Sequence, residues 1–155
     1  VSVYNEQLQE VARKRYPIPY GWFALDVAMS GGTLVAASSA PVSDTTSARP
    51  SLGVLRVDLR GGLGGGLSRV LPLPSDHLEE VRIVGGATPW VVVGSRLNRE
   101  YWLRALEAEH LLPLTPWQQS AQSCVSAWPD VFWTGKETFL AWQTSGGHWY
   151  RSLGL

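Results

Sequence analysis

Short apolar runs separated by glycines and prolines set the hydrophobic pattern of this chain. Residues 53–59 alternate between apolar and polar side chains. Alternation with a period of two predicts strands that bury one face. Trp90 to Gly94 is apolar throughout, which is typical of a strand covered on both faces. From Ala24 onward the pattern therefore predicts strands joined by turns.

The strands expected from these patterns are 22–28, 33–37, 53–59, 68–73, 80–84, 90–94, 101–106, 111–114, 124–128, 131–134, 138–143 and 148–153. Residues 41–50 are rich in Ser, Thr and Pro, and they predict a long loop. The stretch from Leu103 to His110 has two interpretations. Its side chains favour a helix, whereas Tyr101 and Trp102 favour a strand that continues through Leu106, and we expect the strand.

The first 21 residues differ from the rest. Tyr4, Leu8, Val11 and Arg15 lie three to four residues apart, which predicts a short helix over residues 2–15. Pro17 and Pro19 would end that helix. Tyr16, Tyr20 and Trp22 follow in a segment that we expect to be extended, and aromatic side chains on such an arm suit contact with a partner protein. Residues 1–21 are thus expected to be a helix and an arm.

A weak internal repeat gives the expected architecture. The apolar run at 90–94 returns as Val131-Phe132-Trp133-Thr134-Gly135, and Leu71-Pro72-Leu73 returns as Leu112-Pro113-Leu114, each 41 residues later. A period near 40 predicts four-stranded antiparallel units over 22–78, 79–119 and 120–155 within one all-β domain, 22–155.

These units resemble the blades of a β-propeller. The resemblance implies an incomplete ring, because propellers usually need about four to eight blades. Two copies would then form a six-bladed ring, or the chain would join a larger assembly. The alternative fold is a single β-sandwich or barrel of about ten to twelve strands, with the repeat accidental.

Composition narrows the function classes. Charged residues make up 17% of the chain, and thirteen basic residues balance thirteen acidic ones, so no long-range attraction to nucleic acid is expected. The single cysteine, Cys124, excludes an internal disulfide and a cysteine-rich metal site. No apolar run has the length of a transmembrane segment. The chain begins at Val1, which is compatible with a removed targeting segment and an organellar or secreted location, although the sequence does not fix the compartment.

The motifs of catalysis and cofactor binding do not occur. His77, His110 and His148 have no partner at metal-ligand spacing, and there is no Gly-x-Ser-x-Gly sequence. The glycine-rich segment 61–66 lacks the following helix of a phosphate-binding loop. We therefore expect no enzyme activity, no catalytic residue, no metal and no cofactor. A hydrolase with a Ser-His-Asp triad stays open as an alternative, because such a triad is recognised by its geometry and not by its sequence.

Tryptophan is the remaining signal, since Trp128, Trp133, Trp142 and Trp149 lie within 22 residues. These rings either fill the core between sheets or form platforms on which a sugar ring stacks. A surface with few charges and many aromatic groups suits a chain that is covered by partners. The sequence thus predicts a non-catalytic structural or scaffold subunit that contacts other subunits or itself. The alternative is a module that binds carbohydrate or another small ligand through these tryptophans.

Overall fold

The computed structural model describes residues 1–16, 24–30, 32–40, 51–60, 62–75, 78, 80–95, 100–119, 129–144 and 146–154. These residues form thirteen strands in four antiparallel sheets of two to four strands, and no helix occurs among them. The strands are β1 Ser2–Tyr4, β2 Glu10–Arg13, β3 Ala24–Ser30, β4 Thr33–Ala40, β5 Ser51–Asp58, β6 Gly66–Pro72, β7 Glu80–Val84, β8 Trp90–Ser95, β9 Glu100–Ala105, β10 Gln118–Gln119, β11 Asp130–Trp133, β12 Thr138–Thr144 and β13 Gly147–Ser152. The expected all-β class is confirmed.

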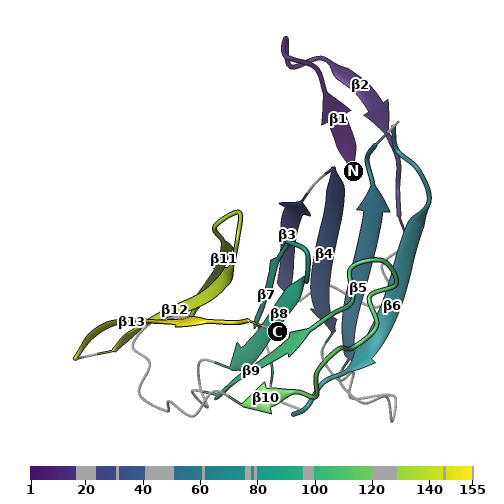
Figure 1. The fold of residues 1–155 in the computed structure, drawn as a ribbon. Helices are drawn as coiled ribbons and strands as arrows, with labels where there is room; N and C mark the ends of the chain where they lie inside the picture. The colour runs from purple at the N-terminus through teal and green to yellow at the C-terminus, as the bar shows by residue number, and fades with distance from the viewer. Residues whose placement is uncertain are drawn as a thin grey trace.

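Three larger sheets follow one another along the chain (Figure 1). The first contains β3 to β6, the second β7 to β10 and the third β11 to β13, and within each sheet every strand pairs with the next one in sequence. Each sheet lies within one of the three predicted units. The division of the chain into those units stays a prediction.

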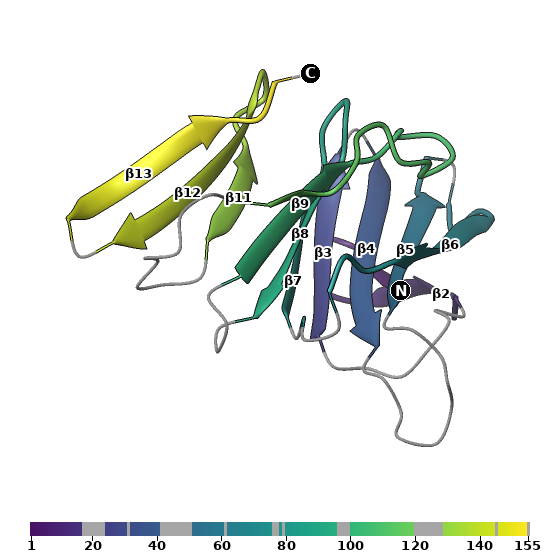
Figure 2. The ribbon, with the colours of Figure 1, turned by 90° about the horizontal axis from the view of Figure 1, so that it is seen from below.

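The second sheet is covered on both faces. Every residue of β8 is buried. Val91 and Val93 belong to a core shared with the first sheet, whereas Trp90 and Val92 belong to a core shared with the third. Because successive side chains of a strand point to opposite faces, a continuous apolar run is what such a position requires. Figure 2 shows this sheet between the other two.

The first strands of the three sheets are neighbours, because β7 contacts both β3 and β11. A polar contact fixes two of them: the carboxylate of Asp26 on β3 accepts a hydrogen bond from the backbone N–H of Ile83 on β7, at 2.9 Å. Two more hydrogen bonds join the first and second sheets away from these strands. The indole Nε1 of Trp117, just before β10, donates to the carbonyl of Pro72 on β6 at 3.0 Å. The side chain of Arg69 on β6 donates to the carbonyl of His110 in the turn after β9. The stack of the first and second sheets is therefore tied at several points.

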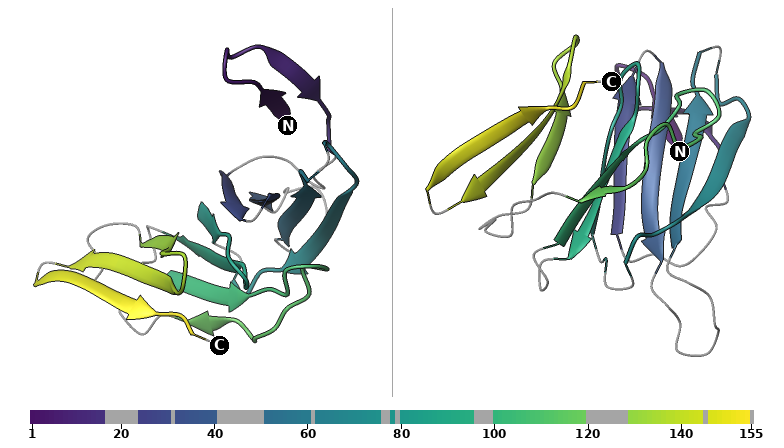
Figure 3. Two further views of the ribbon diagram at one scale, coloured as in Figure 1. Left: turned by 45° about the horizontal axis from the view of Figure 1, so that its top comes forward. Right: turned by 60° about the horizontal axis from the view of Figure 1, so that its bottom comes forward.

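The predicted helix over residues 2–15 is wrong, because β1 and β2 form an antiparallel hairpin there. The side-chain oxygen of Asn5 accepts hydrogen bonds from the backbone N–H groups of Gln7 and Gln9, and Leu8 has a φ of +59°. A side chain that bonds its own backbone in this way competes with a helix and favours a turn. The hairpin projects beyond β4 and β5 in Figure 1 and in the left panel of Figure 3.

The expected strand over 111–114 is also wrong. Pro113 makes only an isolated bridge with Leu106, and the last strand of the second sheet is the short β10. Leu111 is buried with a φ of +56°, which is not a strand conformation, and the hydroxyl of Thr115 accepts the hydrogen bond of the Ala105 N–H. The chain therefore bends where a strand was expected.

Most other strands were predicted at or near their observed positions. The helical alternative for residues 103–110 is excluded, since β9 runs to Ala105 and a turn follows. The expected loop 41–50 and the expected strand 124–128 lie outside the described residues. Three consecutive antiparallel sheets are compatible with a repeat of blade-like units, and the described strands form no closed barrel or ring.

Candidate functional site

The two ends of the stack of sheets carry the candidate site. For each larger sheet we call the side turned toward the N-terminal end of the stack the leading face, and the opposite side the trailing face. On β3, Asp26 and Ala28 point from the trailing face toward the second sheet. Leu25, Val27 and Met29 alternate with them and therefore lie on the leading face.

These three side chains form an apolar stripe that is open to solvent, with between 47 and 56% of each residue exposed. Their equivalents on the first strands of the other sheets are Val81 and Ile83 on β7 and Val131 on β11, which belong to the cores between sheets. Those equivalents are only 1 to 8% exposed. The leading face of the first strand is thus covered by a neighbouring sheet in the second and third sheets and is open to solvent in the first.

Tyr16 covers another part of the first leading face. Its ring packs with the buried cluster of Leu55 and Val57, and a Cβ atom added at Gly66 would lie 2.6 Å from the ring. The Tyr16 hydroxyl and the Lys14 ammonium both donate to the carbonyl of Gly64, at 2.9 Å. Tyr16, which was predicted as a contact residue of the arm, therefore lies over β5 and β6 and leaves the β3 stripe open.

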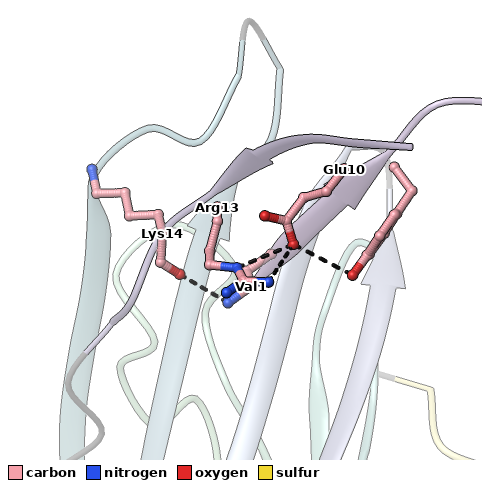
Figure 4. A network of polar contacts seen from close by, with 5 residues as sticks. Val1, Glu10, Arg13 and Lys14 are labelled. Atoms are coloured by element: carbon pink, nitrogen blue, oxygen red, sulfur yellow. Dashed lines mark hydrogen bonds and ion pairs between the residues drawn. The ribbon is translucent and has the colours of Figure 1, made fainter. Parts of the chain in front are cut away.

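The N-terminal hairpin is held by contacts within itself (Figure 4). Glu10 and Arg13 form an ion pair at 2.6 Å, and the N-terminal ammonium group of Val1 donates to the carbonyl of Lys14 at 2.9 Å. The hydrogen bond from Arg13 lowers the pKa of the Glu10 carboxyl below its ordinary value. A two-stranded hairpin is marginally stable on its own in water. The ion pair and the hydrogen bonds within the hairpin therefore contribute to holding its shape.

The trailing face of the third sheet is aromatic. Val131 points toward the second sheet, so its neighbour Phe132 lies on the trailing face. Phe132 stacks on Phe139 with ring centroids 5.8 Å apart, and Phe139 meets Tyr150 edge to face at 6.3 Å. Phe132 and Tyr150 are both exposed. This cluster spans all three strands of the sheet.

The predicted tryptophans that the structure describes lie on the opposite, leading face of the third sheet. Trp133 and Trp142 pack against the core between the second and third sheets. A Cβ atom added at Gly86 would lie 3.2 Å from the Trp133 ring. Trp149 pairs with Trp142 across the strands and is half exposed. Two of the rings thus fill space between sheets, and the third is accessible. Tyr20, Trp22 and Trp128 lie outside the described residues.

A pocket of about 320 Å³ adjoins Trp133. Thr88 and Trp90 contribute to it from the second sheet's side, and Lys136 and Glu137 from the turn between β11 and β12. Two aromatic side chains together with several polar groups are the kind of lining that binds a small polar ligand. A module that binds carbohydrate or another small ligand, the alternative expected from the sequence, would use this pocket.

One cluster of titratable groups is brought together by the turn after β9. Ligand atoms of Glu107, Glu109 and His110 lie within 4.8 Å of one another. The Glu107 carboxylate accepts hydrogen bonds from the backbone N–H groups of Glu109 and His110, at 2.7 and 2.6 Å. These bonds lower the pKa of the Glu107 carboxyl. Through these two hydrogen bonds, the Glu107 carboxylate caps the turn after β9.

The residues of both end faces were not predicted from the sequence. Leu25, Val27 and Met29 stand at every second position of β3, which overlaps the strand expected over 22–28, and this alternation was the available signal. Alternation shows that a strand has an apolar face, but it does not show whether another sheet covers that face. Phe132 and Tyr150 were not predicted as contact residues, because the prediction for this region rested on the density of tryptophan alone.

No protein-family model and no curated protein matches the chain. Within the described part of the chain, no helix has the length and apolar character needed to cross a membrane.

Proposed function

We propose that this chain is a non-catalytic structural subunit whose three sheets are blades of a propeller-like ring that further sheets complete. The observation that carries the proposal is the open stripe of Leu25, Val27 and Met29, whose equivalents on β7 and β11 are buried between sheets. An apolar surface that the same fold covers elsewhere is expected to be covered in the working assembly.

The arrangement of the sheets supports the comparison with blades. Each sheet is built from consecutive antiparallel strands, and the first strands of the three sheets lie together. Each sheet buries apolar side chains against the next. In a propeller, twisted four-stranded sheets pack in this way around a centre. An arc of three such sheets has two end faces.

The chemistry of these end faces favours protein contacts. Each carries exposed apolar or aromatic side chains, and the chain has no net charge that would steer it to nucleic acid. Covering a half-exposed aliphatic side chain contributes on the order of 1 kcal/mol, so a stripe of three contributes a few. The projecting hairpin and Tyr16 stand beside the leading face and extend the surface that a partner would meet.

The size of the native particle tests this proposal. The tagged chain is expressed in its native host, and extracts are separated by size. We expect the wild type to elute as an assembly and the double variant Val27→Glu/Met29→Glu to elute near 17.0 kDa. Gln119→Glu places a charge on an exposed position of β10 and should behave as the wild type. A wild-type chain that elutes near 17.0 kDa contradicts the proposal.

The alternative function is a module for carbohydrate or another small polar ligand, and the pocket beside Trp133 favours it. Titration with a panel of sugars should then change the tryptophan fluorescence of the wild type. Lys136→Ala, which removes a polar group from the pocket wall, should weaken that response, whereas Gln119→Glu should not. Unchanged fluorescence with every sugar would exclude carbohydrate as the ligand.

A further inference from the structure

We propose that the partner of the open leading face is the trailing face of a second copy of this chain, so that two copies pack head to tail at two equal interfaces. This inference rests on the proposed function and names its partner. The ring would contain six sheets, three from each copy, which lies within the usual range of about four to eight blades.

The interfaces inside the molecule supply the packing rule. The trailing face of the first sheet, with Val35 and Val54, packs on the leading face of the second, with Val91. The trailing face of the second sheet, with Trp90, packs on the leading face of the third, with Leu140. A trailing face thus meets a leading face at both interfaces. The chain carries one further open face of each kind, and these two would meet in a pair of copies.

The chemistry of the two open faces is complementary in the same sense. The leading stripe is aliphatic, formed by Leu25, Val27 and Met29, whereas the trailing cluster is aromatic, formed by Phe132, Phe139 and Tyr150. Between the second and third sheets, the ring of Trp90 belongs to the same cluster as Val131 and Leu140. A trailing-face ring therefore already packs against aliphatic groups of a leading face in this fold, beside the leading-face rings of Trp133 and Trp142.

Symmetry and charge favour a second copy over an unrelated partner. A head-to-tail contact joins different patches of identical chains, and it ends in a closed ring when the rotation permits. In a ring of two, each copy uses both of its open faces, and no apolar end remains. The formal net charge of zero means that two copies do not repel each other over distance.

The mass of the purified chain, measured by light scattering after size exclusion at micromolar concentration, tests the inference. We expect a particle of twice 17.0 kDa for the wild type and for the Gln119→Glu control. Val27→Glu on the leading face and Tyr150→Glu on the trailing face should each give a single chain of 17.0 kDa with unchanged circular dichroism. Met29→Lys and Phe132→Lys repeat the two changes if either glutamate variant fails to fold.

Mixing the two variants makes the test specific for head-to-tail packing. A Val27→Glu chain keeps its trailing face, and a Tyr150→Glu chain keeps its leading face, so the mixture retains one intact interface. We expect a two-chain particle in the mixture and in neither variant alone. A pair formed by Tyr150→Glu alone would show leading faces packed on each other and would overturn the inference.

The other outcomes separate this inference from the proposed function. A wild-type particle of three or more copies overturns the pair of copies. A purified wild-type chain that stays single also overturns it, while an assembly in host extracts would leave the structural subunit standing with a different partner. Single chains in both experiments would remove both proposals.

Discussion

At Gly86, both the backbone conformation and the packing between sheets favour glycine. Its φ is +145°, and a Cβ atom there would lie 3.2 Å from the Trp133 ring. Gly147 has a similar φ of +136°, but a Cβ atom there would meet no atom within 4 Å. Both positions favour glycine for the backbone, and only Gly86 also needs the space.

We predict that Gly86→Ala lowers the free energy of unfolding more than Gly147→Ala does. Each change costs about 1 kcal/mol or more in backbone strain, and Gly86→Ala also displaces Trp133 from the core. Chemical denaturation of the two variants beside the wild type measures the difference. Equal losses would mean that the contact between Gly86 and Trp133 contributes nothing to stability.

Glu107 gives a prediction about pH. Hydrogen bonds from the backbone of Glu109 and from His110 lower the pKa of its carboxyl from the ordinary value of 4.5. The ionised form therefore stabilises the fold at pH values above 4.5, and this contribution is lost as the pH falls through the lower pKa of the folded state. Glu10 and Asp58 shift in the same direction because arginines hydrogen-bond to them, so they add to the acid sensitivity of the wild type.

We expect the free energy of unfolding to fall between about pH 7 and about pH 3, and Glu107→Gln to make that fall smaller. Urea denaturation at the two pH values measures both. Glu109→Gln, a change at the adjacent exposed carboxylate, is the matched control. If Glu107→Gln shows the same fall as the wild type, the bonds to the turn do not depend on its charge.

At the scale of strands, the sequence predicted those elements whose formation depends on the local pattern of side chains. Residues 80–84 and 90–94 were expected as strands and form β7 and β8, because alternation and a short apolar run are both typical of strands. The helix over 2–15 failed because it rested on a few spaced apolar residues, whereas the side chain of Asn5 bonds the turn that makes a hairpin. Such a bond is hard to distinguish in sequence from an ordinary polar position.

The sequence could not show which face of each strand is covered by another sheet. The sequence shows the cluster of tryptophans, but not whether their rings lie in the core or bind a ligand. The position of the second sheet decides this for Trp133 and Trp142, which pack against it. The stripe of Leu25, Val27 and Met29 has the same pattern as a buried one. Only the arrangement of sheets shows that it is exposed.

The hairpin of β1 and β2 should be dispensable for folding of the three larger sheets. Its ion pair and hydrogen bonds lie within the hairpin, whereas Lys14 and Tyr16 make the contacts with the 62–66 turn. We predict that deletion of residues 1–13 changes the melting temperature of a single-chain variant by only a few degrees, because little buried apolar surface is lost. Tyr16→Ala, which opens the cluster of Leu55 and Val57, should cost more. A deletion that prevents folding would show that the hairpin is part of the core.

At the scale of the whole molecule, the three sheets form a stack whose middle is buried and whose ends are open. β8 is covered on both sides, while β3 and the strands of the third sheet each leave an apolar side exposed. A fold of this kind adds sheets one after another, and each addition buries the face that the previous one left open. The ends are therefore where the molecule is expected to meet its partner.

The most direct measurement compares Val27→Glu with Val81→Glu by chemical denaturation. Both are made in the Tyr150→Glu background, so that every protein compared is expected to be a single chain. Val27 is exposed on β3, and Val81 occupies the equivalent face of β7 between two sheets. We predict a loss of about 3 kcal/mol or more for Val81→Glu, which buries a charge, and of about 0.5 kcal/mol or less for Val27→Glu. Equal losses would place the β3 stripe in the core of the single chain and contradict an open end face.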